Sequence, residues 1–473
     1  MSDWETVVGL EVHTELRTST KLFCGCRNAF GDPPNTNICP VCLGLPGSLP
    51  VLNRQAVELA MRIGDALHCE IRPSIFHRKN YFYPDMPKDY QVSQYDLPIN
   101  VDGWLELPDG SRVGIERAHM EEDTGKTVHV GTSGRIQGAD HSLVDYNRAG
   151  VPLVEIVGRP DIRSAEQARA YVAELRAILV AAGASDGKME EGSLRVDANV
   201  SVRPLGSTDF GTRCEIKNVN SLRSLGRAIE FEARRQVDLL TSGGRVAQET
   251  RHWHEDEGRT VPGRSKEQAE DYRYFPEPDL VPVAPPAEWI AAVRQSLPVL
   301  PAERRARLAK AAGVEPAEVA TVVGYDLDGL VLGAIEAGAD PRIALNRATN
   351  ELATDLDAAS ALKVEAFASL CKMEGDGRLT ATQAKQVLAE MLSSGGSPSS
   401  IAEAHGFRPL DTSAVVDAVD AAIEADPAAW ARYRAGEDKV AGVFVGAVMK
   451  ATGGKADGKA VTALLRQRRA EAG

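Results

Sequence analysis

Hydrophobic and polar residues alternate along the N-terminal segment of this chain. Between residues 8 and 16, one side of the alternation carries Val8, Leu10, Val12 and Leu16. The other side carries Glu11, His13 and Glu15. A period of two residues is that of a β-strand with one buried face. The pattern therefore predicts a strand on which Glu11 and His13 point in the same direction.

A second segment shows the same alternation more regularly. From residue 193 to residue 203, the hydrophobic side carries Leu194, Val196, Ala198, Val200 and Val202. Asp197 falls on the other side, together with arginine, asparagine and serine residues. This predicts a half-buried strand whose polar face presents Asp197.

Glu155 stands in a different context, because it interrupts the hydrophobic run from Val151 to Val157. An ionised carboxylate in such a run needs a cation or hydrogen-bond donors as partners. A bound metal and an arginine are both compatible with the sequence. Two more acids, Glu121 in HMEEDTGK and Glu215 in CEIKN, also lie on predicted strands or strand ends.

Together these acids form a set whose members are Glu11, Glu121, Glu155, Asp197 and Glu215. A single acid on a polar strand face is usually solvated surface charge. Five acids on predicted strands indicate instead an oxygen-rich floor that holds hard cations against phosphate. Mg²⁺ often uses only one or two carboxylates in addition to substrate phosphates. The five acids, with His13 nearby, could supply ligands for two such ions. His13 considered alone would more often be a structural residue, as a lone histidine on a strand usually is.

The composition and the predicted secondary structure of the chain change after a proline-rich segment at residues 275–286, FPEPDLVPVAPP. Before it, predicted strands mix with glycine and proline turns and a few helices, such as residues 166–182, which predicts an α+β domain over residues 1–290. After it, the chain is rich in Ala, Leu, Glu and Arg. This composition predicts a helical domain over residues 291–405 and a helical tail domain over residues 406–473. In the tail, residues 440–454 predict a helix closed by two glycines.

The formal net charge of −13 argues against a protein that coats nucleic acid without specificity. Local basic patches are still compatible with it, because residues 430–473 hold nine lysines and arginines against four acids. A solvated helix surface explains this surplus as well as a nucleic-acid contact does. The sequence has no hydrophobic run of the roughly 18 residues that a membrane helix needs, and no N-terminal signal-peptide pattern. We therefore expect a cytoplasmic protein without a membrane segment.

Four of the seven cysteines are closely spaced, as Cys24-x-Cys26 followed by Cys39-x-x-Cys42. The odd total fits a reducing compartment better than a disulfide framework. Two paired short spacings resemble a structural zinc site, in which four thiolates surround Zn²⁺ as a closed tetrahedron. The alternative is four free thiols.

Two further stretches combine aromatic and basic residues. In residues 77–94, HRKNYFYPDMPKDYQVSQ, the rings alternate with Arg78, Lys79 and Lys88. In residues 270–279, EDYRYFPEPD, Arg273 lies between two tyrosines. Such a mixture suits a base stacked on a ring and phosphates met by cations, although aromatic clusters more often belong to a core. Neither a P-loop nor a Rossmann glycine motif occurs in the sequence.

Seven ordered motifs together resemble the GatB/GatE family, the B subunits of the GatCAB tRNA-dependent amidotransferases. They are VVGLEVHTEL, RKNYFYPDMPKDYQVSQ, HMEEDTGK, LVDYNRAGVPLVEIVGRPDIRS, KMEEGSLRVDANVSVRP, EIKNVNS and DYRYFPEPDL. The resemblance runs from Thr6 to Leu280 and continues more loosely to the C-terminus. It implies a cradle domain with a central antiparallel sheet, followed by a helical domain and a helical tail that contacts tRNA.

The resemblance also implies an activity and partners. The family's enzymes convert Glu-tRNA(Gln) to Gln-tRNA(Gln), and in many organisms Asp-tRNA(Asn) to Asn-tRNA(Asn). They are heterotrimers of GatB with an amidase, GatA, and a small third protein, GatC. GatA releases ammonia from glutamine, and GatB phosphorylates the misacylated side-chain carboxylate with ATP. Since the acyl phosphate must be kept from water, we expect an intersubunit tunnel for the ammonia.

Carried over from the family, the site residues fall into three groups. His13, Glu121 and Glu155 are implied as ligands of one Mg²⁺, and Glu11, Asp197 and Glu215 as the shell of a second cation. The catalytic set is Glu11, His13, Glu121 and Glu155. The nucleotide is expected near Lys79, Tyr81, Lys88 and Gln91. We choose Glu121 over Glu122 because Glu121 shares the alternation of His119.

Two other functions remain open from the sequence. One is a self-contained ATP-dependent ligase that acts on a free amino acid. The other is a tRNA-binding or assembly scaffold whose carboxylates are only structural. The chain also departs from the family at Arg347, where members commonly have a tryptophan.

Overall fold

The computed structural model describes residues 3–131, 138–263, 272–407, 412–452, 456 and 458–471. The chain divides into two compact units, residues 1–303 and residues 304–473. The first mixes strands and helices and the second is helical, which confirms the predicted α+β class with helical regions after it. Asp271, at the start of the DYRYFPEPDL motif, lies outside the described residues.

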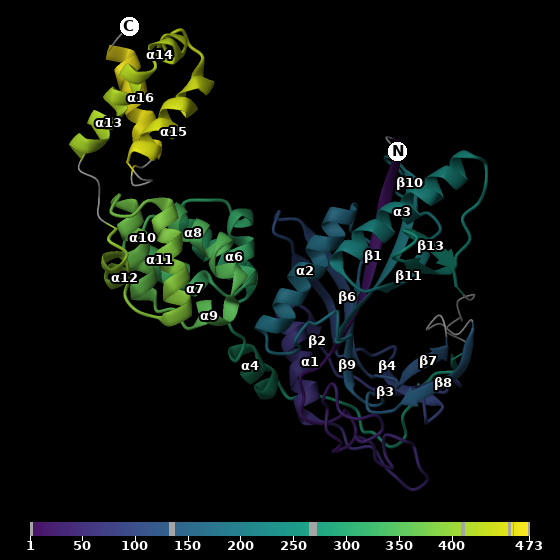
Figure 1. The fold of residues 1–473 in the computed structure, drawn as a ribbon. Coiled ribbons are helices and arrows are strands. Elements are labelled where there is room, and N and C mark those ends of the chain that lie inside the picture. Colours follow the sequence, from purple (N-terminus) through teal and green to yellow (C-terminus); the bar gives the residue numbers. More distant parts are fainter. Residues whose placement is uncertain are drawn as a thin grey trace. The chain divides into compact units, whose positions relative to one another are not determined.

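One large sheet organises the first unit (Figure 1). Its main path runs in the order β13 (Arg259–Pro262), β12 (Thr250–His254), β11 (Cys214–Val219), β10 (Leu194–Pro204), β1 (Trp4–Glu15), β9 (Pro152–Gly158), β6 (Arg112–Glu122), β4 (Tyr90–Gln94), β3 (Phe76–Asn80) and β14 (Phe275–Pro276). Off this path, β5 (Asn100–Glu106) pairs with β6 and with β2 (Glu70–Ile71). Neighbouring strands among the described residues are antiparallel except β11 with β12. A separate hairpin consists of β7 (Lys126–Gly131) and β8 (Ala139–Asp145).

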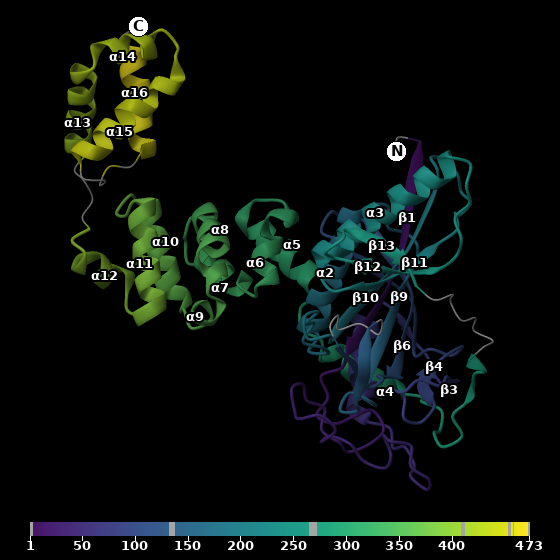
Figure 2. The ribbon, with the colours of Figure 1, turned by 45° about the vertical axis from the view of Figure 1, so that its right-hand side comes forward.

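The hydrophobic face of this sheet is covered by three helices, α1 (Arg54–Ala66), α2 (Ala165–Ala181) and α3 (Leu222–Thr241). Figure 2 shows α2 and α3 along the sheet. The alternation predicted for β1 is confirmed, because Val8, Leu10 and Val12 are almost fully buried in the shared core. Helix α2 confirms the helix predicted at residues 166–182. Because one face of the sheet is filled in this way, the polar face is left to form the site.

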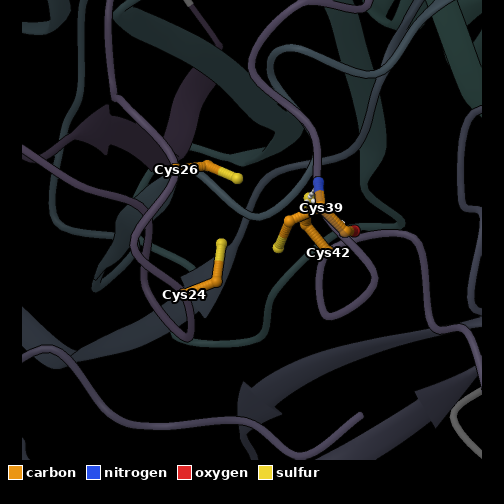
Figure 3. A group of neighbouring side chains, drawn as sticks. All are labelled: Cys24, Cys26, Cys39 and Cys42. Carbon is orange, nitrogen blue, oxygen red and sulfur yellow. Dashed lines mark hydrogen bonds between the residues drawn. The ribbon is translucent and has the colours of Figure 1, made fainter.

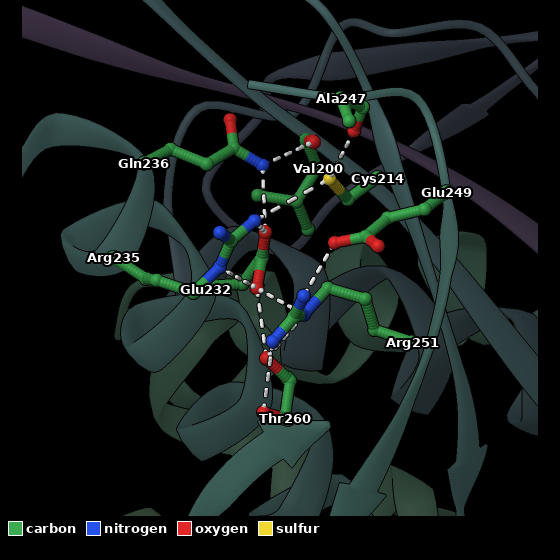
Figure 4. Close-up of polar contacts among 9 residues, drawn as sticks. All are labelled: Val200, Cys214, Glu232, Arg235, Gln236, Ala247, Glu249, Arg251 and Thr260. Atoms are coloured by element: carbon green, nitrogen blue, oxygen red, sulfur yellow. Dashed lines mark hydrogen bonds and ion pairs between the residues drawn. The ribbon is translucent and has the colours of Figure 1, made fainter. Parts of the chain in front are cut away.

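Helix α3 also contacts β10–β13 through a buried polar network (Figure 4). Glu232 on α3 is fully buried and accepts hydrogen bonds from Arg235, from Gln236 and from the Thr260 hydroxyl, at 2.6 to 3.0 Å. The Arg251 guanidinium on β12 lies 3.4 Å from the same carboxylate and donates to Thr260 Oγ1 at 2.9 Å. Burial alone would raise the pKa of Glu232, but these donors hold it below its ordinary value.

The remaining helices follow the proline-rich segment. They are α4 (Ala287–Gln295), α5 (Pro301–Ala312), α6 (Ala320–Gly324), α7 (Asp328–Glu336), α8 (Pro341–Asn350), α9 (Leu356–Ser360), α10 (Val364–Gly375), α11 (Ala381–Ser394), α12 (Pro398–Ala404), α13 (Thr412–Ala425), α14 (Pro427–Arg434), α15 (Ala441–Ala451) and α16 (Gly458–Glu471). Val293 on α4 belongs to the core of the first unit, which therefore extends past residue 290. The second unit has two hydrophobic clusters, one within residues 308–402 and one within residues 415–465. The glycines predicted to close α15, Gly453 and Gly454, lie outside the described residues.

Arg347 on α8 is buried in this helical unit. Its guanidinium donates two hydrogen bonds to the Glu374 carboxylate, at 2.9 and 2.8 Å, and one to the Ala381 carbonyl oxygen at 2.8 Å. A buried arginine is tolerated when its charge is paired and its N–H groups are satisfied. The departure at Arg347 is therefore accommodated by an internal ion pair. Among the described helices, none combines the length and the hydrophobicity that a membrane span requires.

Candidate active site

A cavity of about 1040 Å³ opens on the polar face of the sheet. Nine of the residues that the sequence pointed to line it: Glu11, His13, Lys79, Tyr81, Gln91, Glu121, Glu155, Asp197 and Glu215. Lys88 is not among the lining residues. The cavity also has lining residues that were not selected as site residues, among them Tyr83, Tyr95, Arg195, Arg213, Lys217, His252, Tyr272 and Tyr274.

Strand register brings the acids together. β1 lies between β9 and β10, and it places Glu11 beside Asp197 and His13 beside Glu155. On the other side of β9, His119 of β6 is the partner of Glu155. Because side chains two residues apart share a face, Glu121 joins His119 on the cavity side. Residues far apart in the sequence thus meet on one patch of sheet.

His13, Glu121 and Glu155 form the tightest group. The His13 Nε2 atom lies 3.6 Å from Glu121 Oε1 and 3.9 Å from Glu155 Oε2, and one ligand atom from each residue lies within 4.8 Å of the others. Around Mg²⁺, with bonds of roughly 2.1 Å, neighbouring octahedral ligands lie about 3.0 Å apart and opposite ones about 4.2 Å apart. The two separations measured from His13 Nε2 fall between those values, so this donor set fits a divalent cation.

His119 supports this triad from β6. Its Nε2 lies 3.1 Å from Glu155 Oε2. Burial alone would raise the pKa of Glu155, but the imidazoles of His119 and His13 lower it well below its usual range. The Glu155 carboxylate is therefore ionised at neutral pH, as a metal ligand must be.

The second predicted group also assembles, but around a lysine. The Lys217 Nζ atom lies 2.6 Å from Asp197 Oδ2 and 3.3 Å from Glu215 Oε1. Glu11 accepts a hydrogen bond from the Asn199 side-chain amide at 2.9 Å. Burial alone would lower the pKa of Lys217, but the carboxylates of Asp197 and Glu215 raise it above its ordinary value. Lys217 was missed in the sequence, although it stands two residues after Glu215 and therefore on the same face.

Tyrosines and Lys79 form an aromatic part of the cavity wall. The Lys79 Nζ atom lies 4.8 Å from the centre of the Tyr272 ring, and the Tyr81 and Tyr83 rings are 5.5 Å apart. Tyr95 and Tyr274 stack with ring centres 4.0 Å apart. Tyr272 and Tyr274 of the EDYRYFPEPD stretch therefore line the cavity, whereas a place in the core is the more common one for such an aromatic cluster.

Lys88 lies elsewhere. Its ammonium pairs with the buried Glu122 carboxylate, which also accepts a hydrogen bond from the Val92 backbone N–H at 2.8 Å. Glu121 faces the cavity and Glu122 does not, as their alternation requires. The expectation that Lys88 contacts a nucleotide in the same cavity as Lys79 has no geometric support.

A charged cluster at one side of the cavity involves Asp123 and Arg195, with Glu15 near both. The Arg195 guanidinium donates to Asp123 Oδ2 at 2.8 Å, and Arg148 lies 3.4 Å from the same oxygen. Burial and the negative charge of Asp123 raise the pKa of Glu15 to about 7. This carboxyl group therefore changes its charge near neutral pH.

The four spaced cysteines gather in the loops between β1 and α1 (Figure 3). Their sulfur atoms all lie within 4.8 Å of one another, and those of Cys39 and Cys42 are 3.9 Å apart. Thiolates around tetrahedral Zn²⁺ lie about 3.8 Å apart, given Zn–S bonds of roughly 2.3 Å. A hydrogen bond from the Cys24 thiol lowers the pKa of Cys42 to about 5. The cluster can therefore bind a metal.

Comparison with known proteins places the chain among amidotransferase subunits. The model of the GatB/GatE catalytic domain matches residues 6–291, and that of the GatB domain matches residues 330–468. The chain therefore belongs to the GatB/GatE family, as its motifs predicted.

Curated relatives support the same assignment over almost the whole chain. A protein of Mycobacterium sp. (strain KMS) is 53% identical over 480 residues, which cover 98% of this chain and 95% of the relative. A protein of Nocardia farcinica is 52% identical with the same coverage, and one of Streptomyces coelicolor is 49% identical over 98% of this chain and 96% of the relative. Each is named as the B subunit of an aspartyl/glutamyl-tRNA(Asn/Gln) amidotransferase. The chain is thus similar to subunits of a ligase-type enzyme that acts on tRNA.

Proposed function

We propose that this chain activates the side-chain carboxylate of Glu-tRNA(Gln), Asp-tRNA(Asn) or both by phosphorylating it with ATP. Ammonia then displaces phosphate and yields Gln-tRNA(Gln) or Asn-tRNA(Asn). The observation that carries the proposal is that His13, Glu121 and Glu155 share one cavity with Lys79 and a group of tyrosines.

The chemistry explains why such a cavity is needed. A carboxylate is a poor electrophile because its oxygen is a poor leaving group, and phosphorylation supplies a better one. The attacking carboxylate is an anion that must approach a polyanionic nucleotide, so catalysis depends on positioning and on charge neutralisation. Mg²⁺ held by His13, Glu121 and Glu155 would supply that neutralisation. His119 would keep the Glu155 carboxylate oriented towards His13.

Lys79, Tyr81 and Gln91 are the proposed nucleotide contacts. The Lys79 ammonium projects into the cavity beside the Tyr272 ring, where it can meet a phosphate. Gln91 is buried, and its amide donates to the Glu122 backbone carbonyl oxygen at 2.7 Å, which fixes its position at the cavity wall. The tyrosine rings offer faces on which an adenine can stack.

The ammonia is proposed to come from partner proteins. The sequence has no serine-serine-lysine amidase signature, so glutamine hydrolysis is assigned to an amidase, GatA, within a heterotrimer that also holds the small protein GatC. An intersubunit tunnel would deliver the ammonia to the cavity. The basic surplus after Trp430 is assigned to tRNA, and the protein to the cytoplasm.

Zn²⁺ is the proposed metal of the cysteine cluster. Four thiolates fill a tetrahedral shell and leave no position for substrate, so the role is structural. Metal analysis of the purified protein should return one zinc per chain. Cys42→Ser should lose it, whereas Cys69→Ser, at a cysteine outside the cluster, should keep it; protein purified without zinc would leave four free thiols.

The activity is tested with the chain assembled with GatA and GatC. ATP consumption should require misacylated tRNA and should collapse in Glu121→Gln, while tRNA binding persists. Glu106→Gln is the matched control, since Glu106 lies on the same sheet in an exposed ion pair with Arg112. ATP consumption with free glutamate alone would favour the self-contained ligase, and full transamidation by Glu121→Gln would favour the scaffold.

A further inference from the structure

Lys217 lies where a second cation was expected. Its ammonium contacts carboxylate oxygens of two different strands, Asp197 on β10 at 2.6 Å and Glu215 on β11 at 3.3 Å. The two carboxylates are largely buried, with side-chain exposures of 17% and 7%. Glu11, the third acid of the group, lies beside Asp197 in the strand register. An ammonium in this position bridges the acids as a metal ion would.

Two of the three acids, Glu215 and Glu11, also accept hydrogen bonds from neighbouring side chains. The Thr250 hydroxyl donates to Glu215 Oε2 at 2.8 Å, and the Asn199 amide donates to Glu11 Oε1 at 2.9 Å. These donors fix the carboxylates in orientations that serve the lysine. A divalent ion bound at roughly 2.0–2.6 Å from the same oxygens would occupy the space of the ammonium, so the two cations exclude each other.

The backbone holds Lys217 in place. Asn218, the next residue, has a left-handed conformation with φ of 66°, and its side-chain amide donates to the Trp253 carbonyl oxygen at 3.0 Å. The pairing of β10 with β11 is irregular between Val196 and Ala198, next to Asp197. Asparagine tolerates this backbone conformation better than most residues. The left-handed Asn218 and the irregular pairing of β10 with β11 thus set the distances of the Lys217 ammonium from Asp197 and Glu215.

We propose that the Lys217 ammonium is the resident cation of the Glu11, Asp197 and Glu215 group. A divalent cation then binds in this cavity only at His13, Glu121 and Glu155. The inference rests on the proposed function solely for the assignment of that triad. Lys217 neutralises part of the negative charge of these three acids, so that no second metal is needed. Its removal should turn the three acids into a divalent-cation site.

The test counts Mn²⁺ bound to the full chain, by the electron paramagnetic resonance signal of free Mn²⁺. All variants carry Glu155→Gln, which disables the triad, so that only the second group is read. With Lys217 intact this background should bind no ion that depends on Glu215. Adding Lys217→Met should create one extra Mn²⁺ site per chain, and adding Glu215→Gln to that variant should remove it again.

Lys217→Gln provides a second neutral side chain in case the methionine variant does not fold, and Lys217→Arg keeps the charge and should create no site. Circular dichroism melting verifies folding of each. The proposal is overturned if the Glu155→Gln background already holds a Mn²⁺ that Glu215→Gln removes. It is equally overturned if a folded neutral variant gains no ion. Failure of the triad assignment looks different: wild type and Glu155→Gln would bind the same number of ions.

Discussion

Two groups of charged residues, one between helix α3 and the sheet and one on the polar face of the sheet, differ in how their carboxylates are satisfied. The network around Glu232 is closed, because the buried carboxylate receives hydrogen bonds from side chains of α3 and β13 (Figure 4). The triad of His13, Glu121 and Glu155 lines a cavity of about 1040 Å³. The carboxylate of the closed network has its partners within the fold, whereas the carboxylates gathered at the cavity around an imidazole are accessible to a ligand.

The largest expected effect is on activity. Glu155→Gln removes the charge of a proposed metal ligand, so phosphate release that depends on misacylated tRNA should fall by at least about a thousandfold. The unfolding free energy should also fall, because the ionised Glu155 pairs with the imidazoles of His119 and His13 in the folded chain, but by less than the loss of the closed Glu232 network costs. Steady-state kinetics and urea unfolding measure the two quantities. If Glu155→Gln unfolded easily but kept its activity per folded molecule, the triad would be a stabilising group and not a catalytic one, which would contradict this contrast with the Glu232 network.

The next effect is on stability. Glu232→Gln leaves Arg235 and Arg251 without the buried carboxylate that they share, which should cost about 3–5 kcal/mol of unfolding free energy. Activity per folded molecule should persist at a temperature well below the transition. The midpoint of urea unfolding is the measurement. Glu166→Gln, at an exposed ion pair with Arg169 on α2, is the control and should change little.

A smaller change is expected at the edge of the same network. Thr260→Val removes the hydroxyl that donates to Glu232 and accepts from Arg251, while it keeps a similar shape. The cost should be about 1–3 kcal/mol, because one buried donor and one buried acceptor lose a partner. Thermal unfolding and a double-mutant cycle with Glu232→Gln measure the effect and the coupling. Strict additivity of the two substitutions would show that the network is not a unit.

The last prediction concerns pH. The pKa of Glu15 is raised to about 7 in the folded chain from an ordinary value near 4.5, so the folded state holds this proton more tightly than the unfolded state. Its contribution to stability is therefore fully present below about pH 4.5 and is lost as the pH rises towards 7. Glu15→Gln should flatten that part of the stability profile, measured by urea unfolding between these pH values. An unchanged slope would mean that Glu15 titrates normally.

Much of the site was predictable because strands have a strict period. The alternation placed Glu11 and His13 on one face of their strand, and Asp197 on the polar face of another, before any strand order was known. The same argument separated Glu121 from Glu122. The division of the acids into two groups came from the family resemblance, since alternation does not say which strands are neighbours. The order with β1 between β9 and β10 supplies that information.

Residues whose positions do not follow from alternation show the limits of periodicity. Lys88 precedes β4, and Asp89 between them has a positive φ of 58°, so no alternation relates Lys88 to the strand face. Lys217 does share the face of Glu215, but its salt bridge to Asp197 depends on a neighbouring strand. The Glu232 network joins α3 to β12 and β13, and its members have no common sequence pattern. Helical residues such as Arg347 were likewise placed only by tertiary packing.

The central claim is that the tRNA-borne carboxylate attacks the γ-phosphate of ATP. If so, one carboxylate oxygen leaves with the phosphate when ammonia attacks the acyl carbon. The most direct measurement uses Glu-tRNA whose side-chain carboxylate is labelled with heavy oxygen, with the chain assembled with its partner proteins and supplied with ATP and glutamine. Mass spectrometry of the released phosphate should find one heavy oxygen for each amide formed. Amide formation with unlabelled phosphate would contradict carboxylate activation by this route.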